Sequence, residues 1–207
     1  MSRLVDLSHV LRDGSPHYPG DEPFRLVQRK SVSEDGFTSF LLKSGFHVGT
    51  HLDAPLHFLE EGAMVQDLPL ATFIGRGVLL DVRGQSLLGP KVEYGSLVTR
   101  GDIVLLWSDW STTYGTDAYY TEHPTLHEGL ADFLIERGVK LLGLDFPSPD
   151  TAPFAIHKKL LDAGIPIIEN LTNLAELAPA RAFDVMAFPL KIRAEGSPVR
   201  VVAQINN

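Results

Sequence analysis

The chain has 207 residues, of which 44% are hydrophobic and 21% charged, proportions that are ordinary for a globular protein. Its net charge of −8 and the lack of any Lys or Arg cluster argue against nucleic acid or an anionic lipid surface as a partner. The absence of cysteine excludes disulfides, thiol nucleophiles and Cys-type zinc sites. Any metal site must therefore be built from His, Asp and Glu, and we expect a small molecule as the partner.

At this length we expect a single domain, residues 1–207, with a sizeable buried core. No apolar run approaches the roughly 18 residues that a membrane-spanning helix needs. The first residues, Met1 to Leu7, lack the long apolar core of a signal peptide. The sequence therefore predicts a cytoplasmic protein with no membrane partner.

The N-terminal half is predicted to consist mostly of strands. Apolar patterning indicates strands at residues 4–11, 25–30, 38–46, 77–82 and 102–107. The polar turn Ser33–Gly36 joins the second of these to the third, and residues 68–73 are expected to form a short helical turn. Residues 13–23 are dense in turn formers but include Tyr18, so we expect a structured loop that packs onto the protein.

The loop at residues 108–120 is unusually aromatic. Five aromatic side chains lie in it or next to it, near Asp109 and Asp117, namely Trp107, Trp110, Tyr114, Tyr119 and Tyr120. We expect this loop either to line a pocket or to form an oligomer contact.

Helices alternate with strands only in the middle of the chain. Thr125 is predicted to begin a helix through a capping box with Glu128, and Gly138 to end it. A second helix is expected from about Pro153 to Asp162. Further strands are expected at residues 140–145, 165–168, 184–191 and 199–203, the last two joined by a turn at residues 195–198. The predicted fold class is α/β, mixed, with a largely β framework.

Three of the eight histidines fall within residues 46–58, with an aspartate between them. The spacing of His47 and His51 would place both on one face of a helix, but Pro55 disfavours a helix here. A strand end that runs into a tight loop could instead aim His47, His51 and Asp53 at one point. Imidazole and carboxylate are ligands that Zn(II) and Mn(II) accept without thiolates. We interpret the cluster as a metal site, although a lone histidine is more often a surface or packed residue.

Residues outside the first three could complete or serve this site. His57 lies close enough to be a proton carrier. His157 shares an inward helix face with Phe154 and Leu161, although a packed histidine would show the same spacing. Glu169 stands at the end of a buried strand, where the alternative is that it faces solvent.

The segment His47-Val-Gly-Thr-His-Leu-Asp-Ala-Pro-Leu-His57 resembles the His-x-Gly-Thr-His-x-Asp-x-Pro-x-His signature of the cyclase-type metal-dependent hydrolases. That family includes bacterial kynurenine formamidase and isatin hydrolase. The resemblance covers nearly the full length of the chain. Its other parts are Asp6-Leu-Ser, Tyr18-Pro-Gly-Asp21, Gly143-Leu-Asp-Phe-Pro-Ser-Pro-Asp150, and His157 to Gly164 followed by Glu169-Asn-Leu.

The resemblance implies a compact β/β/α domain of the kynurenine formamidase type that forms a homodimer or homotetramer. It also implies two zinc ions, with Mn(II) as an alternative, held by His47, His51, Asp53, His157 and Glu169. Asp53 and Glu169 would be carboxylates that can bridge metals. Relatives of the isatin hydrolase type carry Gln at the position of Glu169 and favour one manganese ion. Glu169 therefore favours the dinuclear, formamidase-like branch.

The implied reaction is metal-assisted hydrolysis of an amide, with an aryl formamide such as N-formylkynurenine as the expected substrate. His57 would be the catalytic residue, carrying the proton from the attacking water to the leaving nitrogen. Tyr18 stands where kynurenine formamidases usually have Trp, and we expect it to bind the aromatic part of the substrate. Ser148 and Asp150 match a loop near the family's site, but they could equally cap the helix that follows.

Other functions remain open at this point. The same metal and His57 could serve a cyclic amide hydrolase like isatin hydrolase, or a cyclase or dehydratase that removes a proton next to a carbonyl. A non-catalytic metal-binding protein would not need His57. A binding module would use only the aromatic loop.

Overall fold

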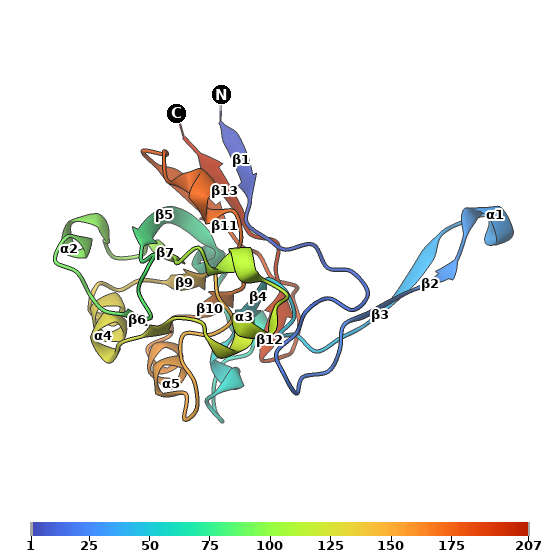
Figure 1. Cartoon of the computed structure of the whole chain (residues 1–207), viewed down its shortest axis with the longest axis horizontal. Coiled ribbons are helices and arrows are strands. Elements are labelled where there is room, and N and C mark those ends of the chain that lie inside the picture. The colour runs from blue at the N-terminus through green and yellow to red at the C-terminus, as the bar shows by residue number, and fades with distance from the viewer. Residues whose placement is uncertain (1, 207) are drawn as a thin grey trace.

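The computed structural model describes residues 2–206 of the chain. Within this range one central sheet has nine strands in the order β1-β13-β11-β5-β7-β9-β10-β4-β12 (Figure 1). The strands are β1 (Arg3–Asp6), β4 (His51–Asp53), β5 (Ile74–Asp81), β7 (Ile103–Trp107), β9 (Leu141–Leu144), β10 (Ile167–Glu169), β11 (Phe183–Met186), β12 (Gly196–Pro198) and β13 (Val202–Ile205). The predicted mixed α/β fold is confirmed.

The middle of the sheet is parallel, because β5, β7, β9 and β10 run in the same direction. Every residue of β7 and β9 is buried, which explains why these segments are almost continuously apolar. Leu106 of β7 faces a core that it shares with α4 (Glu128–Glu136) and α5 (Ala155–Asp162). Its neighbour Leu105 faces a second core, formed with β1, β11 and β13. The sheet is therefore covered on both faces.

Shorter elements fill the connections. A small parallel pair is formed by β6 (Leu87–Leu88) and β8 (Thr125–Leu126). The short helices are α1 (Val32–Asp35), α2 (Tyr94–Leu97) and α3 (Asp117–Thr121), with 3-10 turns at Pro55–His57, Val65–Asp67, Leu70–Phe73, Trp110–Thr113 and Leu174–Leu177. The helical turn predicted at residues 68–73 is thus confirmed. No helix in the described range is long and apolar enough to cross a membrane.

The predicted helix start at Thr125 is wrong. Thr125 belongs to β8, where its backbone N–H donates to Ser86 O at 3.0 Å. The helix α4 begins three residues later, and His127 caps it by accepting from Gly129 N at 3.0 Å. Strand pairing with a distant segment overrode the local capping signal. The predicted end holds, since Gly138 has φ +64°.

Residues 195–198 are not a simple turn. Gly196–Pro198 form the edge strand β12, which pairs with β4 in antiparallel register. The two strands that the turn was expected to join, β11 and β13, do pair with each other. The turn predicted at Ser33–Gly36 is a single helical turn, α1, which ends at Asp35 and is followed by Gly36 with φ +79°. The first strand, predicted to reach residue 11, ends at Asp6.

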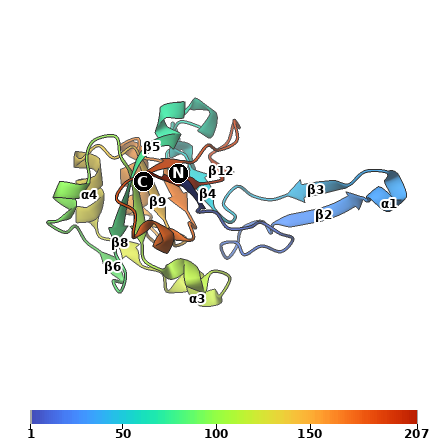
Figure 2. The same ribbon diagram turned by 90° about the horizontal axis from the view of Figure 1, so that it is seen from above.

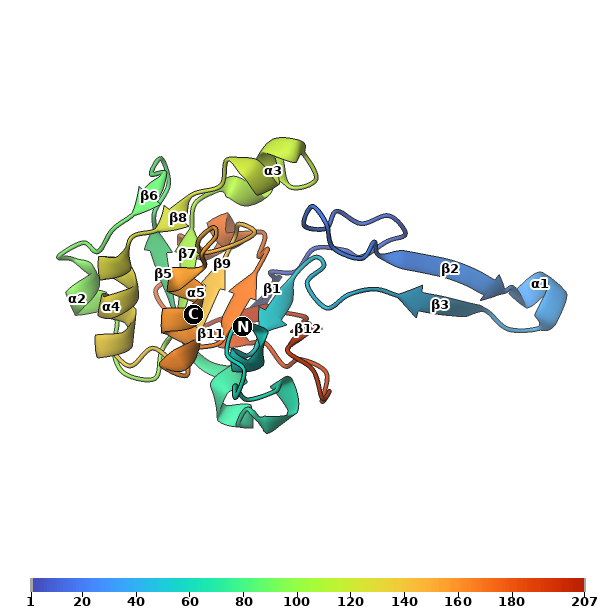
Figure 3. The ribbon, with the colours of Figure 1, turned by 90° about the horizontal axis from the view of Figure 1, so that it is seen from below.

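One part of the chain stands apart from the rest. The strands β2 (Arg25–Lys30) and β3 (Ser39–Lys43) form a separate two-stranded sheet, with α1 at its tip. This hairpin projects far from the body of the molecule (Figures 2 and 3). We refer to residues 25–43 as the arm and to the remainder as the body.

Candidate metal centre

The strands β4 and β10 place three polar side chains on one face of the sheet. His51 and Asp53 are two residues apart on β4, so their side chains point to the same side. Glu169 lies directly opposite His51 in the antiparallel register of β10 and β4. All three are buried, with exposed fractions of 1%, 1% and 6%. The alternative that Glu169 faces solvent is therefore wrong.

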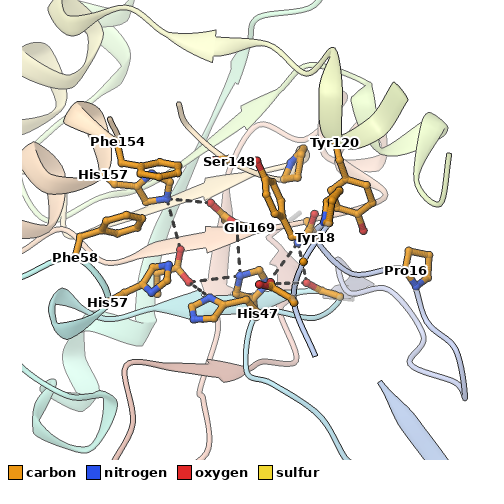
Figure 4. A pocket seen from close by; sticks show the side chains of 18 residues that line it. Pro16, Tyr18, His47, His57, Phe58, Tyr120, Ser148, Phe154, His157 and Glu169 are labelled. Carbon is orange, nitrogen blue, oxygen red and sulfur yellow. Dashed lines mark hydrogen bonds and ion pairs between the residues drawn. The ribbon is translucent and has the colours of Figure 1, made fainter. Parts of the chain in front are cut away.

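The remaining candidate residues come from the two sides of these strands. His47 lies in the loop before β4, and its Nδ1 is 2.8 Å from Asp53 Oδ1. His157 lies on α5, and its Nε2 is 3.3 Å from Glu169 Oε1 and 3.8 Å from Asp53 Oδ2. The fold thus brings together all five residues for which a ligand role was expected (Figure 4).

The five side chains form two overlapping groups that could each hold a metal ion. One group is His47, His51 and Asp53, and the other is Asp53, His157 and Glu169. Within each group the ligand atoms lie within 4.8 Å of one another. Because Asp53 belongs to both groups, its two carboxylate oxygens can face two neighbouring cations.

Outer hydrogen bonds fix the orientation of two imidazole rings. His51 Nδ1–H donates to Gly49 O at 2.8 Å, and His157 Nδ1–H donates to Asp150 Oδ1 at 2.5 Å. When each ring is neutral, this bond makes Nε2 the nitrogen without a proton, and Nε2 faces the carboxylates of the cluster, as metal ligands require. Asp150 also accepts from Ile156 N at 2.6 Å, so it caps α5 as well.

Several polar atoms in the cluster have no conventional partner. His47 Nε2, His51 Nε2 and Asp53 Oδ1 are buried and form no hydrogen bond of good geometry with the described residues, although Asp53 Oδ1 lies 2.8 Å from His47 Nδ1. Buried polar atoms are nearly always bonded, so such a group of orphans requires an explanation. A cation bound between them would satisfy all three, and the imidazole and carboxylate donors suit zinc or manganese. The residues therefore fit a metal.

The electrostatics of the cluster also favour a positive charge at its centre. Burial lowers the pKa of His51, but Asp53 and Glu169 raise it more, to about 10. For His157, burial again lowers the pKa, and Asp150 and Glu169 raise it to about 9. The carboxylates thus attract a cation strongly enough to hold protons on these rings in the absence of one. A divalent ion would replace those protons.

His57 differs from the other histidines of the cluster. It ends the 3-10 turn Pro55–His57, and its ring stacks on His47 with the centroids 4.0 Å apart. Burial lowers the pKa of His57, and this effect outweighs the attraction of Asp53. Burial therefore favours the neutral form of the ring, which can accept a proton.

The cluster lines a pocket of about 490 Å³. Tyr18 and Tyr120 form one wall, with their rings edge to face at 5.8 Å. Phe58 and Phe154 line the pocket on another side, with centroids 5.1 Å apart. The pocket is thus suited to an aromatic molecule whose polar end reaches the histidines and carboxylates (Figure 4).

The aromatic loop is held in place by its own side chains. Trp110 Nε1 donates to Tyr119 O at 3.0 Å, and Tyr114 stacks on His9 at 3.8 Å. At the base of the loop, buried Asp145 accepts from Ser108 Oγ at 2.5 Å and from the backbone of the same residue. Of the two roles expected for this loop, pocket lining is confirmed through Tyr120.

Sequence reasoning missed two polar residues of the site. Glu195 precedes β12, and its Oε1 is 3.5 Å from His47 Nε2. Asn170 lines the pocket, and its Nδ2 donates to Gly49 O at 3.0 Å. The only available signal for Asn170 was its position after Glu169. Glu195 gave none, because it lies in a segment that was expected to be a turn.

Comparison with known proteins agrees with this geometry. The model of the family described as "Putative cyclase" matches residues 5–151. The chain belongs to the cyclase family. The matched range includes the segment from His47 to His57, while His157 and Glu169 lie beyond it.

Relatives and solved structures extend the match to the whole chain. A kynurenine formamidase of Bacillus cereus is 34% identical across 97% of this chain and 97% of that protein. Isatin hydrolase A of Labrenzia aggregata, solved with benzyl benzoate bound, superposes with a TM-score of 0.89 at 26% identity, covering 100% of this chain and 94% of that one. A structure described as a potential metal-dependent hydrolase with cyclase activity gives 0.82 at 25%, covering 100% of both chains. These likenesses and the two ligand groups support a metal cofactor.

Proposed function

We propose that this protein is a metal-dependent amide hydrolase that acts on an aryl formamide such as N-formylkynurenine. The observation that carries the proposal is the pair of ligand groups that share Asp53 and line a pocket with aromatic walls. The kynurenine formamidases among its full-length relatives, at 34% identity, support the same reaction.

The proposed metal content is two zinc ions per chain, with Mn(II) as the alternative. His47, His51 and Asp53 would hold one ion, and Asp53, His157 and Glu169 the other. A metal bound there lowers the pKa of a water molecule and polarises the carbonyl of the amide. The carboxylate of Glu169 supports the second ion, because an amide side chain at this position would carry no charge.

The protein's own residues supply the proton transfer and the positioning. His57 accepts a proton from the water that attacks the formyl carbon and delivers it to the leaving nitrogen as the C–N bond breaks. The products are formate and the aryl amine. Tyr18 and Tyr120 hold the aromatic ring of the substrate, which places the formyl group toward His57 and the ligand cluster.

A cyclic amide is the second candidate substrate. The likeness to isatin hydrolase A, with a TM-score of 0.89, favours it. Tyr18 also bears on the choice, because its hydroxyl makes the pocket more polar than the Trp usual in kynurenine formamidases. The same residues would open a lactam by the same proton transfer, with the amine remaining attached to the product.

We also propose that residues 1–207 act as one domain and assemble into a homodimer or homotetramer. The two cores, packed on opposite faces of a single sheet, support the first statement. The exposed arm described above supports the second.

The test combines metal analysis with a substrate panel. Purified protein is expected to contain about two metal ions per chain and to hydrolyse an aryl formamide faster than isatin. Chelation should abolish turnover, and Zn(II) or Mn(II) should restore it. One ion per chain with lactam turnover would favour the second candidate, and metal-bound protein that is inactive on every amide would refute both.

A further inference from the structure

The residue directly before α5 has a backbone conformation that its side chain disfavours. Phe154 has φ +60° and ψ +44°, which is the left-handed helical region. The other non-glycine residues of the described range with positive φ are Asp109, Asn170 and Asn173, and Asp and Asn tolerate this region better than most residues. For a bulky side chain it is an outlier, because Cβ crowds the following carbonyl oxygen. The backbone at Phe154 is therefore strained.

Capping of α5 does not explain why this residue is a phenylalanine. The residue before a helix usually caps it with a side-chain oxygen, which Phe154 lacks. Asp150 caps α5 instead, since its Oδ2 accepts from Ile156 N at 2.6 Å. The left-handed residue lies where the chain turns back into the helix, so that the same carboxylate also accepts from His157 Nδ1–H. A glycine would make that turn at lower energy, so the turn does not account for the phenyl ring.

The phenyl ring of Phe154 is half-buried and lines the pocket. Its centroid lies 5.1 Å from that of Phe58, and 6.0 Å from that of His157 in an edge-to-face arrangement. Figure 4 shows Phe58 and Phe154 beside His157, on the side of the pocket away from Tyr18 and Tyr120. An aromatic group that enters the pocket can therefore contact aromatic side chains on two sides.

We propose that the strained backbone at Phe154 is retained because its ring contacts the aromatic part of the substrate, which makes Phe154 a specificity-determining residue for aromatic over saturated rings. Strain of this kind persists only where the surrounding structure holds it, and it is concentrated at binding sites. Aromatic rings attract one another beyond what their buried area contributes, and a saturated ring of similar size lacks this attraction. The inference rests on the proposed function for the class of substrate, but its tests measure stability and binding rather than turnover.

Thermal unfolding of Phe154→Gly and Phe154→Ala tests the strain. Both variants remove the ring, so their difference reports the cost of the left-handed backbone. Alanine is more stable than glycine where the backbone is ordinary, and the order reverses at positive φ. We expect the glycine variant to unfold about 2–4 °C above the alanine variant.

Two further pairs of variants calibrate this difference. Asn173→Gly and Asn173→Ala, at φ +59° and outside the pocket, should show the same order as the pair at Phe154. Lys158→Gly and Lys158→Ala, at an exposed position within α5, should show the opposite order. A Phe154→Ala variant at least as stable as Phe154→Gly would overturn the strain and with it the proposal.

Phe154→Leu tests the contact with the substrate, because leucine keeps an apolar side chain but has no aromatic ring. Calorimetry measures the binding of acetanilide and of N-cyclohexylacetamide to the full-length protein loaded with Zn(II). These two probes carry a methyl group in place of the formyl hydrogen and differ from each other only in the ring. The wild type should bind acetanilide more tightly, and Phe154→Leu should reduce this preference about two- to tenfold.

The matched control is Phe133→Leu, at a partly buried phenylalanine of α4 that does not line the pocket, and it should keep the wild-type preference. The role of Phe154 in recognition would be overturned by an unchanged preference in Phe154→Leu, or by a wild type that binds the two probes equally or binds neither. A preference that falls in Phe154→Leu, in a protein that hydrolyses no amide, would refute the proposed reaction and leave the aromatic contact standing.

Discussion

The ligand cluster and the aromatic wall face each other across one pocket, but they are supported differently. His51, Asp53 and Glu169 lie on two paired strands in the interior of the protein, and His157 lies on a helix packed against them. Tyr18 comes from a loop and Tyr120 from the short helix α3, and both line the pocket. Strand register sets the position of a side chain more tightly than a loop does. The proposed chemistry therefore depends on the core, while the proposed substrate contacts depend on segments that can change without disturbing the core.

The largest effect is expected from His51→Ala, which removes a proposed metal ligand from the cluster on β4 and β10. The variant should lose bound metal and fall to the activity of chelated protein, because the carboxylates of Asp53 and Glu169 are left facing each other without it. Metal analysis by plasma emission spectrometry checks this result. The control is His127→Asn, an exposed cap of α4 that should keep full metal content. Retention of two ions by His51→Ala would contradict the assignment.

The next effect is expected from His57→Asn, which separates proton transfer from metal binding. This variant should keep its metal and lose about 10²–10⁴ in kcat, the range typical of a general acid–base. Steady-state kinetics on metal-loaded protein measure the loss. Near-wild-type kcat would show that the proton takes another route.

Asp150→Asn tests how far metal binding by the ligand cluster depends on the hydrogen bond that orients His157. Asn can still cap α5, so the helix is preserved, but the charged partner of His157 Nδ1–H is lost. We expect metal affinity to fall by about 10–100-fold, as is typical for such partners. A competition titration with a chelator measures it. An unchanged affinity would limit Asp150 to its capping role.

The smallest effect is expected at the aromatic wall formed by Tyr18 and Tyr120. Tyr120→Leu removes an aromatic contact worth about 0.5–1.5 kcal/mol, so KM for an aryl formamide should rise about two- to tenfold. Metal content and kcat should stay close to wild type, and KM for an aliphatic formamide should not change. A loss of metal in this variant would show that the two halves of the site are not independent.

The two halves also differ in how well the sequence predicted them. The segment from His47 to His57 holds four of the proposed site residues within eleven residues, so a local pattern was sufficient to propose them. The spacing of His157 and the position of Glu169 predicted only an inward face and a strand end. For the aromatic segment that contains Tyr120, the sequence predicted either pocket lining or an oligomer contact and did not decide between them.

The sequence by itself determined the chemistry available, the buried parallel strands and the helix that carries His157, because each depends on residue type and short-range periodicity. The tertiary structure alone decided that Glu169 lies opposite His51, since register is set by pairing between segments more than a hundred residues apart. It also moved the start of α4 to Glu128 and turned residues 196–198 into a strand beside β4. At Thr125, backbone hydrogen bonds to a distant segment outweighed a local capping signal worth about 1 kcal/mol. At residues 196–198, pairing with β4 outweighed the local turn signal.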